Sequence, residues 1–162
     1  MSSERNKALI RRLFDEVLNA GNFGLLDQLI GASYVEHNPV AKQAAGAAGI
    51  RERIQTMRTA FPDLRFVVDE LIAEDAIVAA RYHWQGTHKG PFLGIAPTGR
   101  RLSVRGMDFY RLDDGRVIEV RHQRAHHRQD LGEAGDGDLL AVADHLERAA
   151  RQHRAVEARD QI

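Results

Sequence analysis

The 162-residue sequence contains no cysteine, which excludes disulfide bonds, thiolate nucleophiles and thiolate metal ligands. Its formal net charge is zero, with 23 Lys plus Arg against 23 Asp plus Glu, so no excess of positive charge favours a nucleic acid or an anionic membrane as partner. No apolar run approaches the roughly 18–20 residues that a membrane-spanning helix needs. The charged N-terminus, MSSERNKALIRRLF, does not look like a secretion signal. These absences favour a cytoplasmic protein with neither a nucleic-acid nor a membrane partner.

The residues that are present have the composition of an ordinary globular protein, 43% hydrophobic and 28% charged, and the first third has helical periodicity. A helix is predicted over residues 4–19, with one apolar stripe formed by Leu9, Ile10, Leu13, Phe14, Val17 and Leu18. A short helix, LLDQLIG, follows, and a third helix begins after Gly46 and Gly49 and ends at Pro62. The stretch YVEHNP between them is predicted to be a loop, because a proline disfavours helical angles in the residue before it.

From residue 64 onward the apolar pattern has a period of two, which predicts strands. The predicted strands are LRFVVDELIAED, AIVAARYHWQGTH, RLSVRGMDFYRLDD and GRVIEVRHQR, and the last two form a hairpin about the turn at 113–115. A polar, Gly-rich stretch and a helix over 138–158 complete the chain. Helices followed by antiparallel strands predict an α+β fold, with a domain at 1–128 and an extension at 129–162. A curved sheet packed against helices leaves a concave side that suits a pocket.

The stretch GTHKGPFLGIAPTGRRLSVRGMDFYRLDDGRVIE carries a family resemblance, together with NAGNFGLLDQLI, YVEHNP and AFPDLRFVVDELIAEDAIVAARYHWQGTH. Over roughly residues 5–124 the chain resembles the SnoaL-like polyketide (ester) cyclases of the nuclear transport factor 2-like superfamily. The resemblance implies an α+β cone, in which the N-terminal helices and a curved antiparallel sheet enclose a pocket. It also implies a lyase or isomerase of antibiotic biosynthesis, which closes a ring by intramolecular aldol condensation without metal or organic cofactor.

Asp108 and His122 are the predicted catalytic couple. The family carries a His on the strand before the final hairpin and an Asp fourteen residues later, and here the two residue types are exchanged. Strand alternation and the turn at 113–115 set Asp108 nearly opposite Val120, with His122 as a diagonal neighbour about 7 Å away at the backbone. An Asp and a His at this separation can form an acid/base couple. The alternative interpretation is a structural ion pair at the open end of the sheet.

Further candidates follow from the resemblance and from strand parity. His37 lies where the family often has a pocket-facing histidine, and it is the third predicted catalytic residue, although it can equally bond backbone atoms. The predicted substrate-binding residues, which can equally be plain core, are Phe14, Leu18, Met57, Tyr82, Trp84, Phe92, Val120 and Arg124. His83 alternates with Tyr82 and is expected to point away. His122, His126 and His127 lack enough companion ligands for zinc, so no metal site is predicted.

The sequence therefore predicts a cofactor-independent acid/base enzyme of the polyketide cyclase type, which closes a ring on a hydrophobic, polyketide-like small molecule. Two alternatives stay open. The same pocket can serve epoxide opening, dehydration or hydroxylation, or it can belong to a non-catalytic small-molecule-binding protein. The resemblance also implies a homo-oligomer, a dimer or tetramer formed through the convex face of the sheet.

Overall fold

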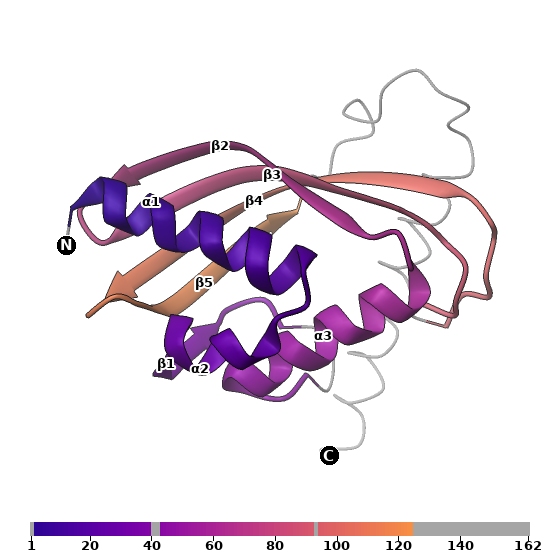
Figure 1. The fold of residues 1–162 in the computed structure, drawn as a ribbon, viewed down its shortest axis with the longest axis horizontal. Coiled ribbons are helices and arrows are strands. Elements are labelled where there is room, and N and C mark those ends of the chain that lie inside the picture. The colour runs from indigo at the N-terminus through magenta and orange to yellow at the C-terminus, as the bar shows by residue number, and fades with distance from the viewer. Residues whose placement is uncertain (1, 40–42, 93, 125–162) are drawn as a thin grey trace, which may run out of the picture.

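The computed structural model describes residues 2–39, 43–92 and 94–124. Along the chain its elements are α1 (Ser3–Arg12), the π-helix η1 (Leu13–Asn19), the 3₁₀ turn η2 (Phe23–Leu25), α2 (Leu26–Leu29), β1 (Ile30–Glu36), α3 (Gly46–Ala60), β2 (Arg65–Glu74), β3 (Ile77–Thr87), β4 (Arg101–Asp113) and β5 (Arg116–Arg124). The predicted α+β fold is confirmed, with helices first and a curved sheet after them (Figure 1). The predicted extension at 129–162, with its helix, lies outside the described residues.

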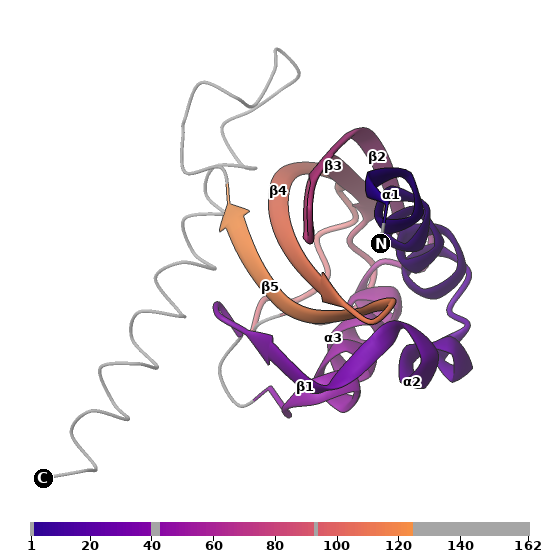
Figure 2. The same cartoon turned by 90° about the vertical axis from the view of Figure 1, so that its left-hand side faces the viewer.

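The sheet has five strands in the order β1-β5-β4-β3-β2, and it curves around the helices (Figure 2). All neighbouring strands are antiparallel except β1 and β5, which run parallel, with Glu36 beside Val120. The sequence did not predict β1, since it assigned Tyr34, Val35 and Glu36 to a loop. That assignment was wrong because β1 is an edge strand whose partner lies far along the chain, and a local pattern carries no signal for such pairing.

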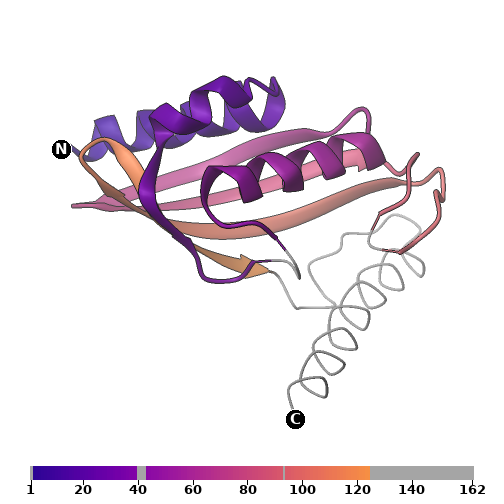
Figure 3. The same cartoon turned by 90° about the horizontal axis from the view of Figure 1, so that it is seen from below.

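The helices cover the concave face of the sheet, where α1 and α3 lie on the same side (Figure 3). α1 contacts β2 and β3, and α3 contacts β1. The helix predicted over 4–19 is present, but its second half is a π-helix, a wider turn that brings Phe14 and Val17 into the buried core. Asn19 ends it and fixes it to β2, since its side chain donates to the Phe66 carbonyl at 2.9 Å and accepts from the Phe66 amide at 2.7 Å.

The β4–β5 hairpin determines which residues of the two strands face each other. Asp114 and Gly115 have φ angles of 42° and 73°, as a two-residue type I′ turn requires. Arg111 pairs with Glu119 while Leu112 pairs with Val117, so one extra residue forms a β-bulge. The shorter turn and the bulge together place Asp108 directly opposite His122. The predicted register, with Asp108 nearly opposite Val120, was therefore wrong by two residues.

The convex face of the sheet carries several large apolar side chains. Ile72, Met107 and Phe109 are 62%, 37% and 40% exposed, respectively. The homo-oligomer expected through this face stays a prediction. Among the described helices, none is both long enough and apolar enough to cross a membrane.

Candidate functional site

Four charged side chains from four elements meet at one end of the concave face. His122 on β5 contacts Asp108 on β4 through Nδ1, with 2.8 Å to Oδ1. Its other nitrogen, Nε2, lies 2.9 Å from Oε1 of Glu36 on β1. Arg53 on α3 donates to the same Glu36 oxygen at 2.8 Å. The side chains of His122, Asp108 and Glu36 are 10%, 4% and 5% exposed, so the imidazole is held between two buried carboxylates.

Tyrosine hydroxyls donate further hydrogen bonds to each of the two carboxylates. Tyr110 donates to Asp108 Oδ2 at 2.9 Å, and Tyr82 donates to Oδ1 at 3.3 Å. Tyr34 donates to Glu36 Oε2 at 3.4 Å. A side chain at Gly106 would place its Cβ 2.8 Å from the Tyr82 ring. The glycine therefore lets Tyr82 cross β4 and reach Asp108.

The hydrogen bonds of the ring indicate the protonation state of His122. Both nitrogens face carboxylate oxygens, and only the imidazolium can donate from both. Burial by itself lowers the pKa of His122, but the hydrogen bonds to Asp108 and Glu36 outweigh it, and the pKa lies above its ordinary value. For Glu36, burial by itself raises the pKa, but the hydrogen bond from His122 and the charge of Arg53 outweigh it, and the pKa is lowered.

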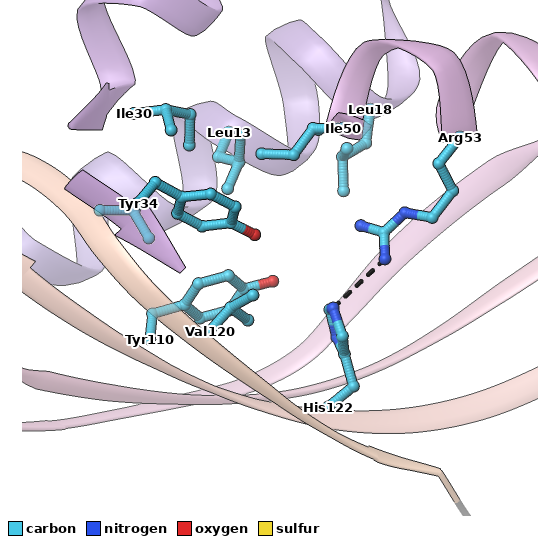
Figure 4. A pocket seen from close by; sticks show the side chains of 10 residues that line it. Leu13, Leu18, Ile30, Tyr34, Ile50, Arg53, Tyr110, Val120 and His122 are labelled. Atoms are coloured by element: carbon cyan, nitrogen blue, oxygen red, sulfur yellow. Dashed lines mark hydrogen bonds between the residues drawn. The ribbon is translucent and has the colours of Figure 1, made fainter. Parts of the chain in front are cut away.

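A cavity lies beside this cluster (Figure 4). Its volume is about 20 Å³, and the whole space between its lining atoms, together with the open solvent at its mouth, is about 310 Å³. Its walls are formed by Leu13, Leu18, Ile30, Tyr34, Ile50, Arg53, Tyr110, Val117, Val120 and His122. The carboxylates of Asp108 and Glu36 lie behind His122, Arg53 and the tyrosines and are not part of the wall. The polar groups in the wall are thus Tyr34, Tyr110, His122 and Arg53, and each of them already donates a hydrogen bond to Glu36 or Asp108.

Several of the predicted site residues meet at this cavity. His122, Leu18 and Val120 line it, and Asp108 contacts His122 from behind. Tyr82 lies on the concave face as predicted, and its hydroxyl contacts the site through a hydrogen bond to Asp108.

Other predicted residues lie elsewhere on the concave side. The Phe14 ring packs 5.2 Å from the Tyr82 ring, as part of the core. Trp84 and Phe92 pack on Phe61 at centroid distances of 5.3 and 5.2 Å, and Met57 is buried in the core. None of these four residues lines the cavity.

His37 does not reach the cavity, contrary to the prediction. It follows Glu36 at the end of β1, and because side chains alternate along a strand, Tyr34 and Glu36 point inward. Its Nε2 instead lies 2.9 Å from Oε1 of Glu119. His83 points away from the concave side, as expected, and lies 3.0 Å from Asp69.

Some predicted residues, at the end of β5 and after it, lie outside the part of the chain that the structure describes. The Arg124 side chain, His126 and His127 lie outside the described part of the chain. Within residues 2–39, 43–92 and 94–124, no group of three or more His, Asp or Glu side chains is arranged to hold a metal ion.

Sequence reasoning missed four polar residues of the site, Tyr34, Glu36, Arg53 and Tyr110. Two of them did leave a signal. Arg53 interrupts the apolar stripe of α3, since it stands at helical spacing between Ile50 and Met57. Glu36 stands beside His37 in YVEHNP, but the loop prediction hid which of the two points inward.

The opposite pKa shifts of His122 and Glu36 predict how stability depends on pH. The contribution of His122, whose folded-state pKa is raised, is complete below its ordinary value of 6.5 and is lost as pH rises through the folded-state pKa. The contribution of Glu36 to folding stability follows the opposite course, because its folded-state pKa is lowered. It is complete above the ordinary value of 4.5 and is lost as pH falls through the folded-state pKa. We expect urea unfolding to show maximal stability from the two groups between these values. His122→Asn should remove the alkaline decline, and parallel curves for variant and wild type above pH 6.5 would refute the assignment.

Comparisons with known proteins agree with this fold. A family model described as SnoaL-like polyketide cyclase matches residues 8–127. TsrD from Streptomyces laurentii is 26% identical, with 77% of this chain and 91% of that chain covered at a TM-score of 0.70. No curated protein sequence matches the chain.

Two further solved structures carry functional descriptions. AclR from Streptomyces galilaeus, described provisionally as a hydroxylase, is 28% identical, with 76% of this chain and 90% of that chain covered and a TM-score of 0.65. IdmH from Streptomyces antibioticus, described provisionally as a polyketide cyclase, is 27% identical, with 74% and 91% covered and a TM-score of 0.64. Because the family model spans most of the chain and the architecture is shared, this chain belongs to the SnoaL-like polyketide cyclase family.

Proposed function

We propose that the chain is a cofactor-independent acid/base enzyme, which closes a ring on a hydrophobic, polyketide-like small molecule by intramolecular aldol condensation. One observation carries the proposal. The imidazole of His122 is held at 2.8 and 2.9 Å between two carboxylates, at the polar end of an otherwise apolar cavity. An aldol closure moves one proton from carbon to oxygen, and a carboxylate and an imidazolium in contact supply the base and the acid for that transfer.

Glu36 is the proposed base and His122 the proposed acid. Glu36 takes the proton from the activated carbon through the Tyr34 hydroxyl, which lines the cavity and donates to Glu36 at 3.4 Å, so that Tyr34 gives its own proton to Glu36 and receives the one from carbon. The resulting carbanion attacks the acceptor carbonyl while His122 gives its Nε2 proton to the carbonyl oxygen. Glu36 then returns its proton to Nε2 across the 2.9 Å contact, so the pair is restored and no proton is left over. This return requires the base to touch the nitrogen that acted as acid. That requirement favours Glu36 over Asp108, which contacts Nδ1 and positions the ring.

A partial reaction tests the proposal without knowledge of the natural substrate. In heavy water, the protein should catalyse exchange of the acidic carbon-bound hydrogen of an aryl β-keto ester, followed by proton NMR. Glu36→Gln should lower the enzyme-catalysed exchange rate about 10²–10⁴-fold, because the variant lacks the base.

Glu119→Gln is the matched control. Glu119 stands next to Val120, and its carboxylate contacts His37, Arg111 and Arg121 rather than the cavity. It should leave exchange unchanged. Equal rates for wild type and Glu36→Gln would refute the assignment of the base.

A further inference from the structure

The cavity is too small to hold a ring compound in this arrangement of its wall. Its volume of about 20 Å³ leaves room for about one water molecule, which needs about 10–15 Å³. The polar groups of the wall are already bonded to the two carboxylates, so they hold one another in place. A ring compound therefore enters only if part of the wall moves.

Arg53 is the wall residue that is best placed to move. Its side chain is 22% exposed, whereas the other nine residues of the wall are at most 10% exposed. Apart from His122, those nine all belong to the hydrophobic core. Arg53 projects from α3 towards His122 (Figure 4), and a long, flexible side chain of this kind can carry its charged end into solvent. Arg53 thus separates the cavity from the solvent.

The inward position of the guanidinium depends on a single ion pair. Nη1 of Arg53 donates to Oε1 of Glu36 at 2.8 Å. Nη1 also lies 3.2 Å from Nε2 of His122, but Nε2 donates to the same Glu36 oxygen, so this contact brings two donors together. The Nε–H of Arg53 is buried and has no hydrogen-bond partner among the described residues, which is unfavourable. Water would satisfy that donor if the side chain turned outward.

Glu36 does not depend on Arg53 alone. Its carboxylate also accepts from His122 at 2.9 Å, from Gln43 at 2.7 Å and from Tyr34 at 3.4 Å. Burial raises the pKa of Glu36, and the hydrogen bond from His122 and the charge of Arg53 lower it. Departure of the guanidinium removes one of the causes that lower the pKa, so the carboxylate that remains is a stronger base.

We propose that Arg53 is a gate, which Glu36 holds across the cavity and which an entering apolar ring displaces into solvent. The movement enlarges the cavity and hydrates the unpaired Nε–H. One consequence rests on the proposed function, in which Glu36 is the base: the carboxylate gains basicity when a substrate has entered. While Glu36 holds the proton it no longer attracts the guanidinium, so the gate stays open until the proton returns to His122.

Exchange of the Arg53 Nε–H with water tests the gate without any reaction. In isotope-labelled full-length protein, its NMR signal is assigned as the one that Arg53→Lys removes. Glu36→Gln should speed this exchange about 10-fold, because a neutral amide holds the guanidinium less strongly than a carboxylate does. Glu119→Gln is the matched control and should leave the exchange unchanged, since Glu119 contacts Arg111 and Arg121 instead. Equal exchange in wild type and Glu36→Gln would overturn the proposal.

Naphthalene, a flat apolar ring without a polar group, tests whether a ligand displaces the gate. Its binding is followed by NMR through the methyl signals of Ile50 and Val120 in the cavity wall. Naphthalene should bind to the wild type and speed exchange of the Arg53 Nε–H. Arg53→Ala should bind it about 10-fold more tightly, because binding no longer breaks an ion pair. Arg51→Ala removes the same charge from an exposed position on α3 and should bind it as the wild type does.

A second variant keeps this test decisive if Arg53→Ala fails to fold. The double variant Glu36→Gln with Arg53→Ala removes both charges of the ion pair and should show the same tighter binding. Absence of naphthalene binding, binding that leaves the Nε–H exchange unchanged, or a variant without Arg53 that binds naphthalene only as tightly as the wild type would each overturn the proposal.

The outcome is separable from that of the proposed function. A protein whose Arg53 is released by Glu36→Gln and by naphthalene, but which exchanges no carbon-bound hydrogen, retains the gate and loses the acid/base reaction. A protein that catalyses carbon-hydrogen exchange through Glu36, but whose Arg53 is released by neither, retains the reaction and loses the gate.

Discussion

Replacing His122 by asparagine should lower the rate of carbon-hydrogen exchange about 10²–10⁴-fold, the usual contribution of a general acid or base. The expected loss is large because, among the described residues, His122 is the only side chain that contacts both carboxylates and also lines the cavity. Asparagine keeps one donor and one acceptor but cannot carry the proton. The rate is measured by proton NMR in heavy water, and circular dichroism and urea unfolding establish that the variant is folded.

Asp108→Asn should lower the same rate less, by about 10²-fold or below, since Asp108 acts through the ring and not on the substrate. Without the carboxylate on Nδ1, the pKa of His122 should fall, and the pH profile of exchange should shift towards acid. A purely structural role for Asp108 would leave that profile in place. The double variant should be little slower than His122→Asn alone, because residues that act as a unit are not additive.

The exchanged variant, Asp108→His with His122→Asp, asks whether the order of the two residues matters. The two positions face each other directly across the β4–β5 ladder, so the swapped side chains can meet at the same place. The swap restores the order that the family resemblance implies, and we expect partial activity. Near wild-type exchange rates in both His122→Asn and Asp108→Asn would make the pair structural and would move any chemistry elsewhere.

The sequence predicted the elements well wherever the evidence for an element was local. The helix over 4–19 and the four strands from residue 64 onward all have an apolar period that reports burial of one face. Asp108 and His122 were picked out by the family resemblance, and strand parity places both on the inner face of the hairpin that joins them. The register was missed because it depends on two features that the alternation pattern does not specify. They are the type of the turn, seen in the positive φ angles of Asp114 and Gly115, and the β-bulge before Glu119.

The remainder of the site depends on contacts between distant parts of the chain. Glu36 and His122 are separated by 86 positions, and Arg53 and His122 by 69. The edge strand β1 brings Glu36 to this place only by pairing with β5, and Arg53 arrives on a helix that packs on β1. A single sequence marks Arg53 as a charge within an apolar stripe, but it does not say which carboxylate lies opposite. A site whose residues come from four separate elements can therefore be recognised only once the fold is known.

Truncation of two Asp–His pairs on this sheet, Asp108–His122 and Asp69–His83, should have very different effects on folding stability. Asp108→Ala should lower the free energy of unfolding by about 3–5 kcal/mol, the usual result of removing one partner of a buried ion pair. The variant leaves an imidazolium without its Nδ1 acceptor and two tyrosine hydroxyls without theirs. Asp69→Ala is the matched control, because Asp69 and His83 form a similar Nδ1–Oδ1 contact at 3.0 Å with side chains 26% and 29% exposed.

The control should cost no more than about 0–1 kcal/mol, since solvent screens the pair and hydrates the histidine that remains. Urea unfolding of both variants at pH 6 gives the comparison, and Asp108→Asn separates lost charge from lost volume. The isosteric amide oxygen can still accept from His122, so its cost should lie between the two alanine variants. If Asp108→Ala costs no more than Asp69→Ala, the imidazole is not held by its carboxylates in the way the 2.8 Å contact indicates, and the acid/base assignment built on that contact fails with it.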